Sequence, residues 1–235
     1  MRVTLHVWRV PRRSVAAEYL RLARDPRRLR SLPGVRFAKL LGTADGFGPG
    51  DGDWTRFAAV LVSEAEVPFA PPGIAARVDL VPVHSRGTWS GEEPFSCTPA
   101  RADKPNGMVL ALTRARLHPA RALRFWRAIS PVVPELDAAP GLLAALGIGE
   151  APIGFQGTVS VWRSSADLTG FAYRQPEHRS VIARTPTDGW YAEELFARFA
   201  VRDITGDRAV LGWRPAPVAA VAVTGGMREG GQGER

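Results

Sequence analysis

Cysteine and lysine are scarce in this 235-residue chain. Its one cysteine, Cys97, cannot form a disulfide within the chain or a cysteine-based zinc site, so we expect a cytoplasmic location. No run of 18 apolar residues occurs, which excludes a membrane-spanning helix by sequence criteria. The first ten residues alternate between apolar and polar types, so no signal peptide is expected. With 45% hydrophobic and 23% charged residues, the composition is that of a globular protein and excludes a disordered or fibrous chain.

The positive charge of the chain comes almost entirely from arginine. Only Lys39 and Lys104 are lysines, so 29 of the 31 basic residues are arginine, and the formal net charge is +8. A net charge of this sign usually suggests nucleic acid or an anionic membrane as a partner. The arginines are scattered, however, and the densest group, between Arg21 and Arg30, has the spacing of a solvated helix face. We therefore expect no nucleic-acid partner.

One sequence pattern occurs twice, about 108 positions apart. Pro33-Gly34 matches Pro140-Gly141, which lies 107 positions later, and Pro11 matches Pro119, which lies 108 positions later. Each copy begins with a stretch that alternates with period two, as a half-buried strand does, and continues with an amphipathic stretch of helical spacing. Two copies of one supersecondary unit are therefore predicted.

Each copy predicts a strand, a helix and then three further strands. The expected strands are Val3–Val7, Gly34–Leu41, Trp54–Val62, Val78–Trp89, Met108–Leu112, Leu142–Leu146, Phe155–Trp162 and Ala209–Trp213. Ser14 is expected to cap the first helix, and Pro119 to begin the second. We predict the α+β class, with tandem ferredoxin-like repeats that form a fused, dimeric α+β barrel. The predicted parts are residues 1–95 (N-terminal half), 96–106 (linker), 107–215 (C-terminal half) and 216–235 (a tail with a disordered end).

The two halves differ between their third and fourth strands. Residues 63–77 make this connection in the first half, whereas residues 164–206 form a long insertion in the second. We predict that the insertion is helical. Spacing of i, i+3, i+4 and i+7 predicts a helix whose apolar face carries Ala192, Leu195, Phe196 and Phe199. We expect the functional site in this insertion.

His178 is the histidine best placed to hold a cofactor. It follows Pro176 and Glu177, which suit the first turn of a helix, and it shares a helical face with Val181 and Ile182. A neutral imidazole on an apolar helix face is what an axial haem ligand requires, because apolar surroundings bury the porphyrin. A histidine on such a face is also common as a hydrogen-bonded structural residue. The spacing by itself leaves both interpretations open.

Several segments form a specific combination, densest after Gly141. They are Ser85–Gly91, Pro94-Phe95, Gly147–Pro152, Gln156–Trp162, Phe171–Arg174, His178 and Trp190–Phe199. Together they resemble the spheroidene monooxygenase family, and the resemblance extends roughly from Val3 to Trp213.

The resemblance implies a monooxygenase that contains haem b. Such an enzyme uses O2 and external electrons, from a donor such as ferredoxin, to oxidise an apolar small molecule, in that family an acyclic carotenoid that becomes a ketone. His178 is then the axial iron ligand, Arg174 and Arg184 are candidates for the haem carboxylates, and Trp190 and Phe196 are candidate pocket walls. For the arginines the alternative is a solvent-facing charge, and for the aromatic residues a place in the core. A carotenoid substrate would imply peripheral contact with a membrane.

Three other functions fit parts of the sequence. A haem-dependent lyase or dehydratase needs the same histidine and apolar pocket, and a cofactor-free oxygenase could use the same barrel. A requirement for reductant separates the oxygenase from the dehydratase. Cys97 as a thiolate ligand ranks behind His178, because it lies in the predicted linker. A tandem RNA-binding or ligand-binding module is the third alternative, but the predicted third strands lack the basic and aromatic pattern of RNA-recognition motifs.

Overall fold

The computed structural model describes residues 1–46, 50–95, 107–118, 132–150, 157–174 and 191–214. Its strands are β1 (Arg2–Arg9), β2 (Val35–Ala44), β3 (Gly52–Ser63), β4 (Ile74–Gly87), β5 (Val109–Leu117), β6 (Leu142–Gly149), β7 (Gly157–Trp162) and β8 (Tyr191–Gly206). Its helices are α1 (Val15–Arg30), α3 (Val132–Asp137), α4 (Ser165–Arg174) and two short 3-10 helices, η1 (Arg12–Ser14) and η4 (Arg208–Leu211). None of the helices in these ranges is long and apolar enough to cross a bilayer.

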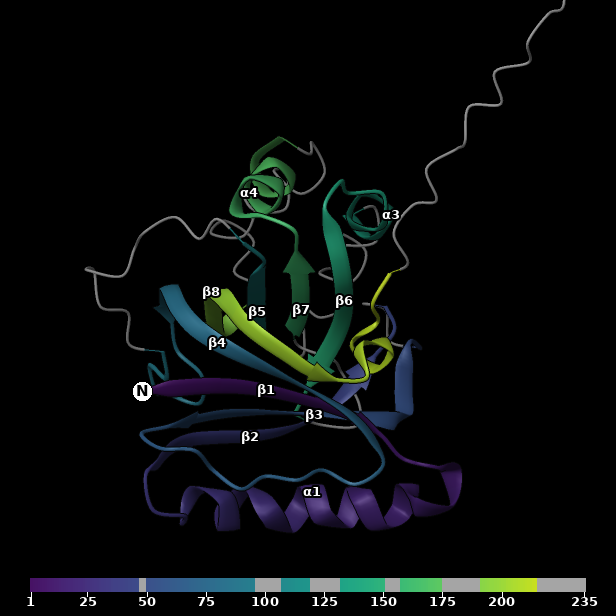
Figure 1. The fold of residues 1–235 in the computed structure, drawn as a ribbon, viewed down its shortest axis with the longest axis vertical. Helices are drawn as coiled ribbons and strands as arrows, with labels where there is room; N and C mark the ends of the chain where they lie inside the picture. Colours follow the sequence, from purple (N-terminus) through teal and green to yellow (C-terminus); the bar gives the residue numbers. More distant parts are fainter. Residues whose placement is uncertain (47–49, 96–106, 119–131, 151–156, 175–190, 215–235) are drawn as a thin grey trace, which may run out of the picture.

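The strands form a closed barrel in which the recorded pairings are antiparallel (Figure 1). Their order around the barrel is β1-β3-β2-β6-β7-β5-β8-β4. The first four strands are therefore neighbours in the order β4-β1-β3-β2, and the last four occur in the equivalent order β8-β5-β7-β6. The predicted α+β class is confirmed, and the described part of the chain is mainly antiparallel sheet with few helices.

Strand β8 occupies a segment for which the spacing predicted a helix, and that prediction was wrong. The strand pairs with β4 along one edge and with β5 along the other. Its sequence also contains an alternating pattern, and the side chains of Leu195, Ala197 and Phe199 are the ones it buries inside the barrel. Pairing on both edges satisfies the backbone groups of β8, so the barrel overrides the local helical spacing.

Strand β8 also bears on two other predictions, one of them wrong and one met only in part. The fourth strand of the second half is β8, and not Ala209–Trp213, most of which belongs to η4. Asp207 begins η4, where its carboxylate accepts a hydrogen bond of 2.9 Å from the Ala209 backbone N–H. In the described part of the expected helical insertion, residues 164–206, only α4 is an α-helix. The helix expected from Pro119 lies largely in residues 119–131, outside the described ranges.

The two Pro-Gly pairs of the repeat lie at equivalent places. Gly34 directly precedes β2, and Gly141 directly precedes β6. Both glycines have left-handed backbone conformations, with φ of 78° and 82°. Only glycine adopts this conformation without a steric cost, which explains why both copies carry it before the second strand. Ser14 precedes α1 as expected, but its side chain makes no capping hydrogen bond.

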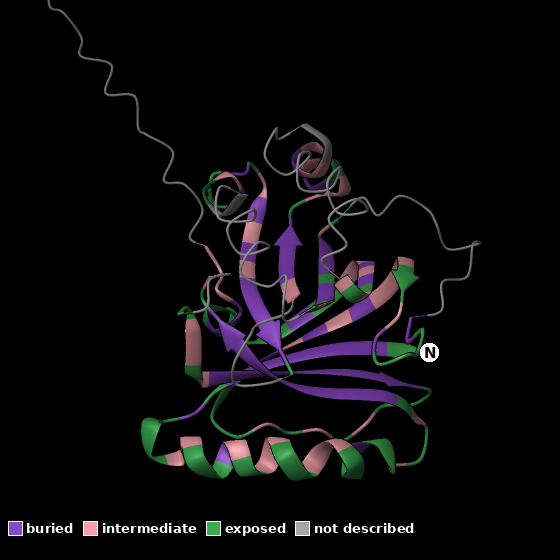
Figure 2. Cartoon of the chain, turned by 180° about the vertical axis from the view of Figure 1, so that it is seen from behind, coloured by how far each residue is buried: buried purple, intermediate pink, exposed green. Residues whose placement is uncertain are grey.

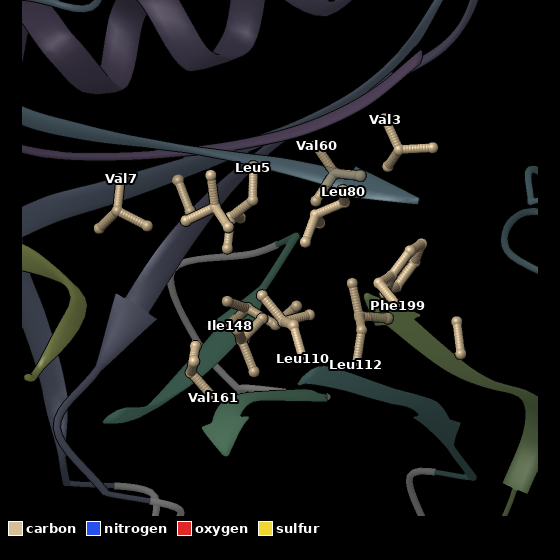
Figure 3. Close-up of a cluster of buried hydrophobic side chains, with 14 of the residues drawn as sticks. Val3, Leu5, Val7, Val60, Leu80, Leu110, Leu112, Ile148, Val161 and Phe199 are labelled. Atoms are coloured by element: carbon tan, nitrogen blue, oxygen red, sulfur yellow. The ribbon is translucent and has the colours of Figure 1, made fainter. Parts of the chain in front are cut away.

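The barrel interior is filled by apolar side chains from both halves (Figure 3). In β1 these are Val3, Leu5 and Val7, as the alternation predicted. Leu110 and Leu112 of β5 face them from the opposite wall in Figure 3. Alternation buries every second side chain in the barrel and leaves the intervening ones for the outer layers.

Each outer face carries its own apolar layer. Helix α1 covers the first sheet, where Trp8, Phe57 and Leu61 are buried (Figure 1). In the second half Trp162 packs with Phe171 of α4, and their ring centroids are 5.3 Å apart. Figure 2 shows the mostly buried strands of the barrel, with α1 along one side and its outward positions exposed.

Candidate functional site

Two cationic side chains lie on the inner face of the barrel. Lys39 of β2 stands between the inward-facing Phe37 and Leu41, and Arg114 of β5 follows the inward-facing Leu112. They are only 6% and 5% exposed. A buried charge is costly unless it is paired and hydrogen-bonded, so the partners of these two residues decide what the site can do.

Glu150, the residue after β6, is the first shared partner. Its carboxylate oxygens lie 2.9 Å from Lys39 Nζ and 3.0 Å from an Arg114 guanidinium nitrogen. The indole N–H of Trp89 also donates to it, over 2.5 Å. Burial by itself raises the pKa of Glu150, but the hydrogen bonds from Lys39 and Trp89 outweigh burial, so the pKa lies below its ordinary value.

Glu193, near the start of β8, is the second carboxylate. It pairs with Arg114 and accepts hydrogen bonds from the Gly91 backbone N–H at 2.7 Å and from the Thr88 hydroxyl at 3.1 Å. Burial raises its pKa, but the Gly91 N–H and the Arg114 guanidinium outweigh this and lower the pKa to about 2. Both carboxylates are therefore ionised near neutral pH, and neither can act as a general acid there.

Trp89 lies between the two cations. Lys39 Nζ is 5.9 Å and the Arg114 guanidinium carbon is 5.6 Å from the centre of a Trp89 ring, which are cation-π distances. Lys39 also donates to the Ser90 hydroxyl over 2.6 Å. Because its two cations are buried, we call the group of Lys39, Trp89, Arg114, Glu150 and Glu193 the buried charge cluster, although the Glu150 side chain is 32% exposed. The cluster lies at the end of the barrel where β4 and β6 end and β8 begins, and its bonds connect these three strands.

The buried charge cluster unites segments that the sequence resemblance singled out separately. Trp89 belongs to Ser85–Gly91, Glu150 to Gly147–Pro152 and Glu193 to Trp190–Phe199. No sequence pattern singled out these residues and their cationic partners as members of a site. A charge inside an apolar strand was the available signal, as at Lys39 in Phe37–Leu41, one of only two lysines in the chain.

The site residues expected from the sequence are mostly outside the part that can be described. His178, Arg184 and Trp190 lie in residues 175–190, and Cys97 lies in residues 96–106. Arg174 is the last residue of α4, and its side chain is not among those described. Within the described ranges, no group of three metal-ligating side chains from His, Cys, Asp and Glu occurs.

Phe196 is the one expected pocket residue that can be placed. It is half-buried on the outer face of β8, opposite to the inward-facing Leu195 and Ala197. Its ring centroid lies 6.3 Å from that of His84 on the neighbouring strand β4. On the same outer face, Arg198 has a buried Nε atom with no hydrogen-bond partner among the described residues. Phe196 therefore does not join the buried charge cluster.

Two cavities accompany these features. One of about 600 Å³ is lined by charged side chains, including Arg36, Arg77, Asp79, Arg202 and Asp203. Another of about 10 Å³ lies against Trp89, Arg114 and Glu150, which is room for about one water molecule. Apolar residues such as Leu80, Val81 and Pro82 also line the first cavity, and the second is too small to enclose a long apolar molecule.

Known proteins are similar to this chain over most of its length. Spheroidene monooxygenase of Rhodobacter capsulatus is 31% identical to it over 201 residues, which cover 79% of this chain and 82% of that protein. The chain belongs to the spheroidene monooxygenase family. The enzyme of the same name from Rubrivivax gelatinosus is 34% identical over 192 residues, with 74% of this chain and 72% of that protein covered. This member is therefore an oxidoreductase of the monooxygenase type, with a small-molecule substrate.

Among solved structures, the crystal structure of an aldoxime dehydratase shares the fold. The TM-score is 0.54 at 10% sequence identity, and the match covers 90% of this chain and 86% of that one. No family model matches the chain.

Proposed function

We propose that this spheroidene monooxygenase family member is a haem-dependent enzyme that oxidises an acyclic carotenoid or a similar apolar molecule. The observation that carries the proposal is the identity of 31% to the Rhodobacter capsulatus enzyme over most of both chains, since that relative is named for its spheroidene substrate. The co-substrates in this proposal are O2 and electrons from an external donor such as ferredoxin.

Residues on the outer face of β8 fit a haem group. Arg198 offers a buried guanidinium N–H without an acceptor among the described residues, and a haem carboxylate would supply one. Phe196 offers a half-buried aromatic ring two residues away on the same face. His178 would ligate the iron, with Arg174 and Arg184 as further partners for the carboxylates and Trp190 as a pocket wall. Bound haem would supply the binding and activation of oxygen.

The buried charge cluster would position this pocket from the other side of the sheet. Glu193 lies two residues after Tyr191, where β8 begins, and the segment that carries His178 leads directly into Tyr191. The ion pair of Glu193 with Arg114 and its hydrogen bond from Gly91, in the loop after β4, hold the start of β8 in register. Because both carboxylates of the cluster are ionised, its role is to position the strand and not to transfer protons.

We also infer that the barrel is a fused pair of ferredoxin-like halves. The equivalent strand orders and the two left-handed glycines support this inference. In this interpretation, the two halves have diverged, and the second half carries the cofactor while the first supplies Lys39 and Trp89 to the cluster.

The test compares His178→Ala with His118→Ala. His118 is an exposed histidine directly after β5, so its replacement should leave haem binding unchanged. Both variants and the unaltered protein are expressed with a haem precursor, and absorption spectra are recorded oxidised, reduced and with carbon monoxide. We expect a histidine-type spectrum that only His178→Ala loses, and carotenoid oxidation that requires reductant. Full haem content in His178→Ala would refute the ligand assignment.

Other outcomes of the same experiment favour the alternatives. A thiolate-type spectrum would transfer the ligand to Cys97. Turnover without reductant in a haem-containing protein would indicate a dehydratase or lyase, and the fold likeness to an aldoxime dehydratase makes that outcome worth measuring. A colourless protein that still consumes O2 would indicate a cofactor-free oxygenase.

A further inference from the structure

The outward face of α1 combines basic and apolar residues. Its inward face packs on the first sheet through Val15, Tyr19 and Leu22. The opposite face is exposed and carries Ala16, Ala17, Leu20, Ala23, Arg24, Arg27 and Arg28. In Figure 2 this helix forms an outermost layer of the molecule, with its exposed positions turned away from the barrel.

Among the described residues, no acidic side chain forms an ion pair with Arg24, Arg27 or Arg28 of this face. The two acidic residues of α1 are both engaged at its sides: Glu18 is buried and accepts from the Trp8 indole over 2.9 Å, and Asp25 pairs with Arg21 over 3.0 Å. Arg24, Arg27 and Arg28 form no ion pair within the described ranges, and neither do Arg12 and Arg13 just before the helix. The face therefore presents a strip of uncompensated positive charge.

Exposed apolar side chains gather around the same helix. In the described part of the chain, four large hydrophobic residues are exposed, and three of them are Leu20 (49%), Trp54 (53%) and Ile74 (57%). Leu20 is on the outward face of α1, and the Trp54 ring lies 6.1 Å from Tyr19 of the same helix. Ile74 pairs with Arg9, close to where β1 leads into η1 and α1.

We propose that the outward face of α1 docks this protein on an anionic lipid bilayer. Arginines around the exposed Leu20, with the exposed Trp54 ring at the side of the same helix, suit the boundary between lipid headgroups and acyl chains, where cations meet phosphates and apolar side chains enter the membrane. Nucleic acid would need the charge but would leave Leu20, on the outward face of α1, without an apolar environment. The proposal deepens the proposed function, because a carotenoid substrate would imply contact with a membrane. Its test is separate, because membrane docking itself requires neither haem nor turnover.

The test measures sedimentation of the full chain with vesicles. Vesicles of phosphatidylcholine with about one-third phosphatidylserine are compared with vesicles of phosphatidylcholine alone. We expect binding to the anionic vesicles and release as the ionic strength rises from about 0.1 M to about 1 M, because the Debye length falls from about 10 Å to about 3 Å. Absence of binding to anionic vesicles at low salt would overturn the proposal.

Two triple variants separate the helix face from the overall charge. Arg24→Gln/Arg27→Gln/Arg28→Gln should weaken partitioning roughly 100-fold, since each arginine near an anionic surface contributes about a factor of five. The control, Arg86→Gln/Arg116→Gln/Arg202→Gln, removes the same charge from exposed strand positions and should bind nearly as the unaltered protein does. Equal loss in both variants would refute docking through α1. Circular dichroism verifies that each variant is folded.

A third variant and a competitor test the chemistry of the partner. Leu20→Gln should weaken vesicle binding several-fold, and unchanged binding would refute insertion of the apolar side chains. A single-stranded RNA oligonucleotide is titrated in parallel. Tight RNA binding at concentrations where vesicles do not bind would assign the face to nucleic acid and overturn the proposal.

Discussion

Replacing Arg114 by methionine should cost far more stability than replacing an exposed arginine. Arg114 is 5% exposed and serves two carboxylates, Glu150 at 3.0 Å and Glu193. Methionine keeps much of the side-chain volume but leaves Glu193, whose side chain is 10% exposed, without its cation. Breaking a buried pair by removing one partner typically costs about 3–5 kcal/mol, and we expect Arg114→Met to fall in that range.

A double-mutant cycle tests whether this cost comes from the charge pair. Glu193→Gln keeps an acceptor for the Gly91 N–H and Thr88 hydroxyl but removes the negative charge. The double variant should therefore be more stable than the sum of the single losses predicts, by at least about 1.5 kcal/mol. Urea unfolding near pH 7, followed by circular dichroism, gives the four free energies of unfolding.

An exposed pair provides the control for the cycle. Arg163 is 67% exposed and pairs with Asp167 over 3.2 Å at a spacing of four residues. Arg163→Met should change the free energy of unfolding by no more than about 0.5 kcal/mol, because water already screens that pair. If the losses at Arg114 and Glu193 added to within about 0.5 kcal/mol, the interpretation of the cluster as a coupled buried pair would be refuted.

Two further predictions concern His6 and the repeat glycines. His6 is 4% exposed, and burial together with the charge of Arg77 lowers its pKa from 6.5 to about 4. The unfolded chain therefore binds a proton that the folded chain excludes, and stability should fall by up to about 3 kcal/mol as the pH drops from 6.5 towards 4. His6→Asn should abolish that part of the pH dependence, and His118→Ala should not. Urea unfolding at several pH values measures this, and an unchanged slope of the free energy of unfolding against pH in His6→Asn would contradict the assignment. At the glycines, Gly34→Ala should cost about 1–2 kcal/mol because of its φ of 78° alone, since an added methyl group meets no atom closer than 3.9 Å. Gly141→Ala should cost about 1 kcal/mol more, because Asp167 occupies the space and must leave its bond to Ser164; equal losses in thermal or urea unfolding would contradict this difference.

Alternation and repetition in the sequence were sufficient to predict most of the fold. Val3, Leu5 and Val7 face the barrel interior as predicted, and the two Pro-Gly pairs precede equivalent strands. These features depend on neighbouring residues, since a strand places every second side chain on one face and a left-handed turn requires glycine locally. Family membership was likewise predictable, because it rests on short segments that keep their residues.

The candidate site was less predictable. Phe196 was expected in a helix beside His178, but it lies on the outer face of a strand, next to His84. No local pattern in the sequence links Lys39 to Glu150, which is 111 residues away, or Arg114 to Glu193, which is 79 residues away. The role of His178 stays a prediction.

The sequence by itself determined which residues alternate, where the repeated Pro-Gly pairs fall and to which family the chain belongs, because each of these depends on residues close together along the chain. Only the tertiary structure decided that Tyr191–Gly206 is a strand and that two buried cations meet two carboxylates at one end of the barrel. Residues 192–199 carry both a helical and an alternating apolar pattern, and the choice between them depends on whether β4 and β5 are present to pair with both edges. A buried charge likewise meets its partner only when distant strands close the barrel. The ion pair that compensates the buried charge therefore forms only in the folded protein.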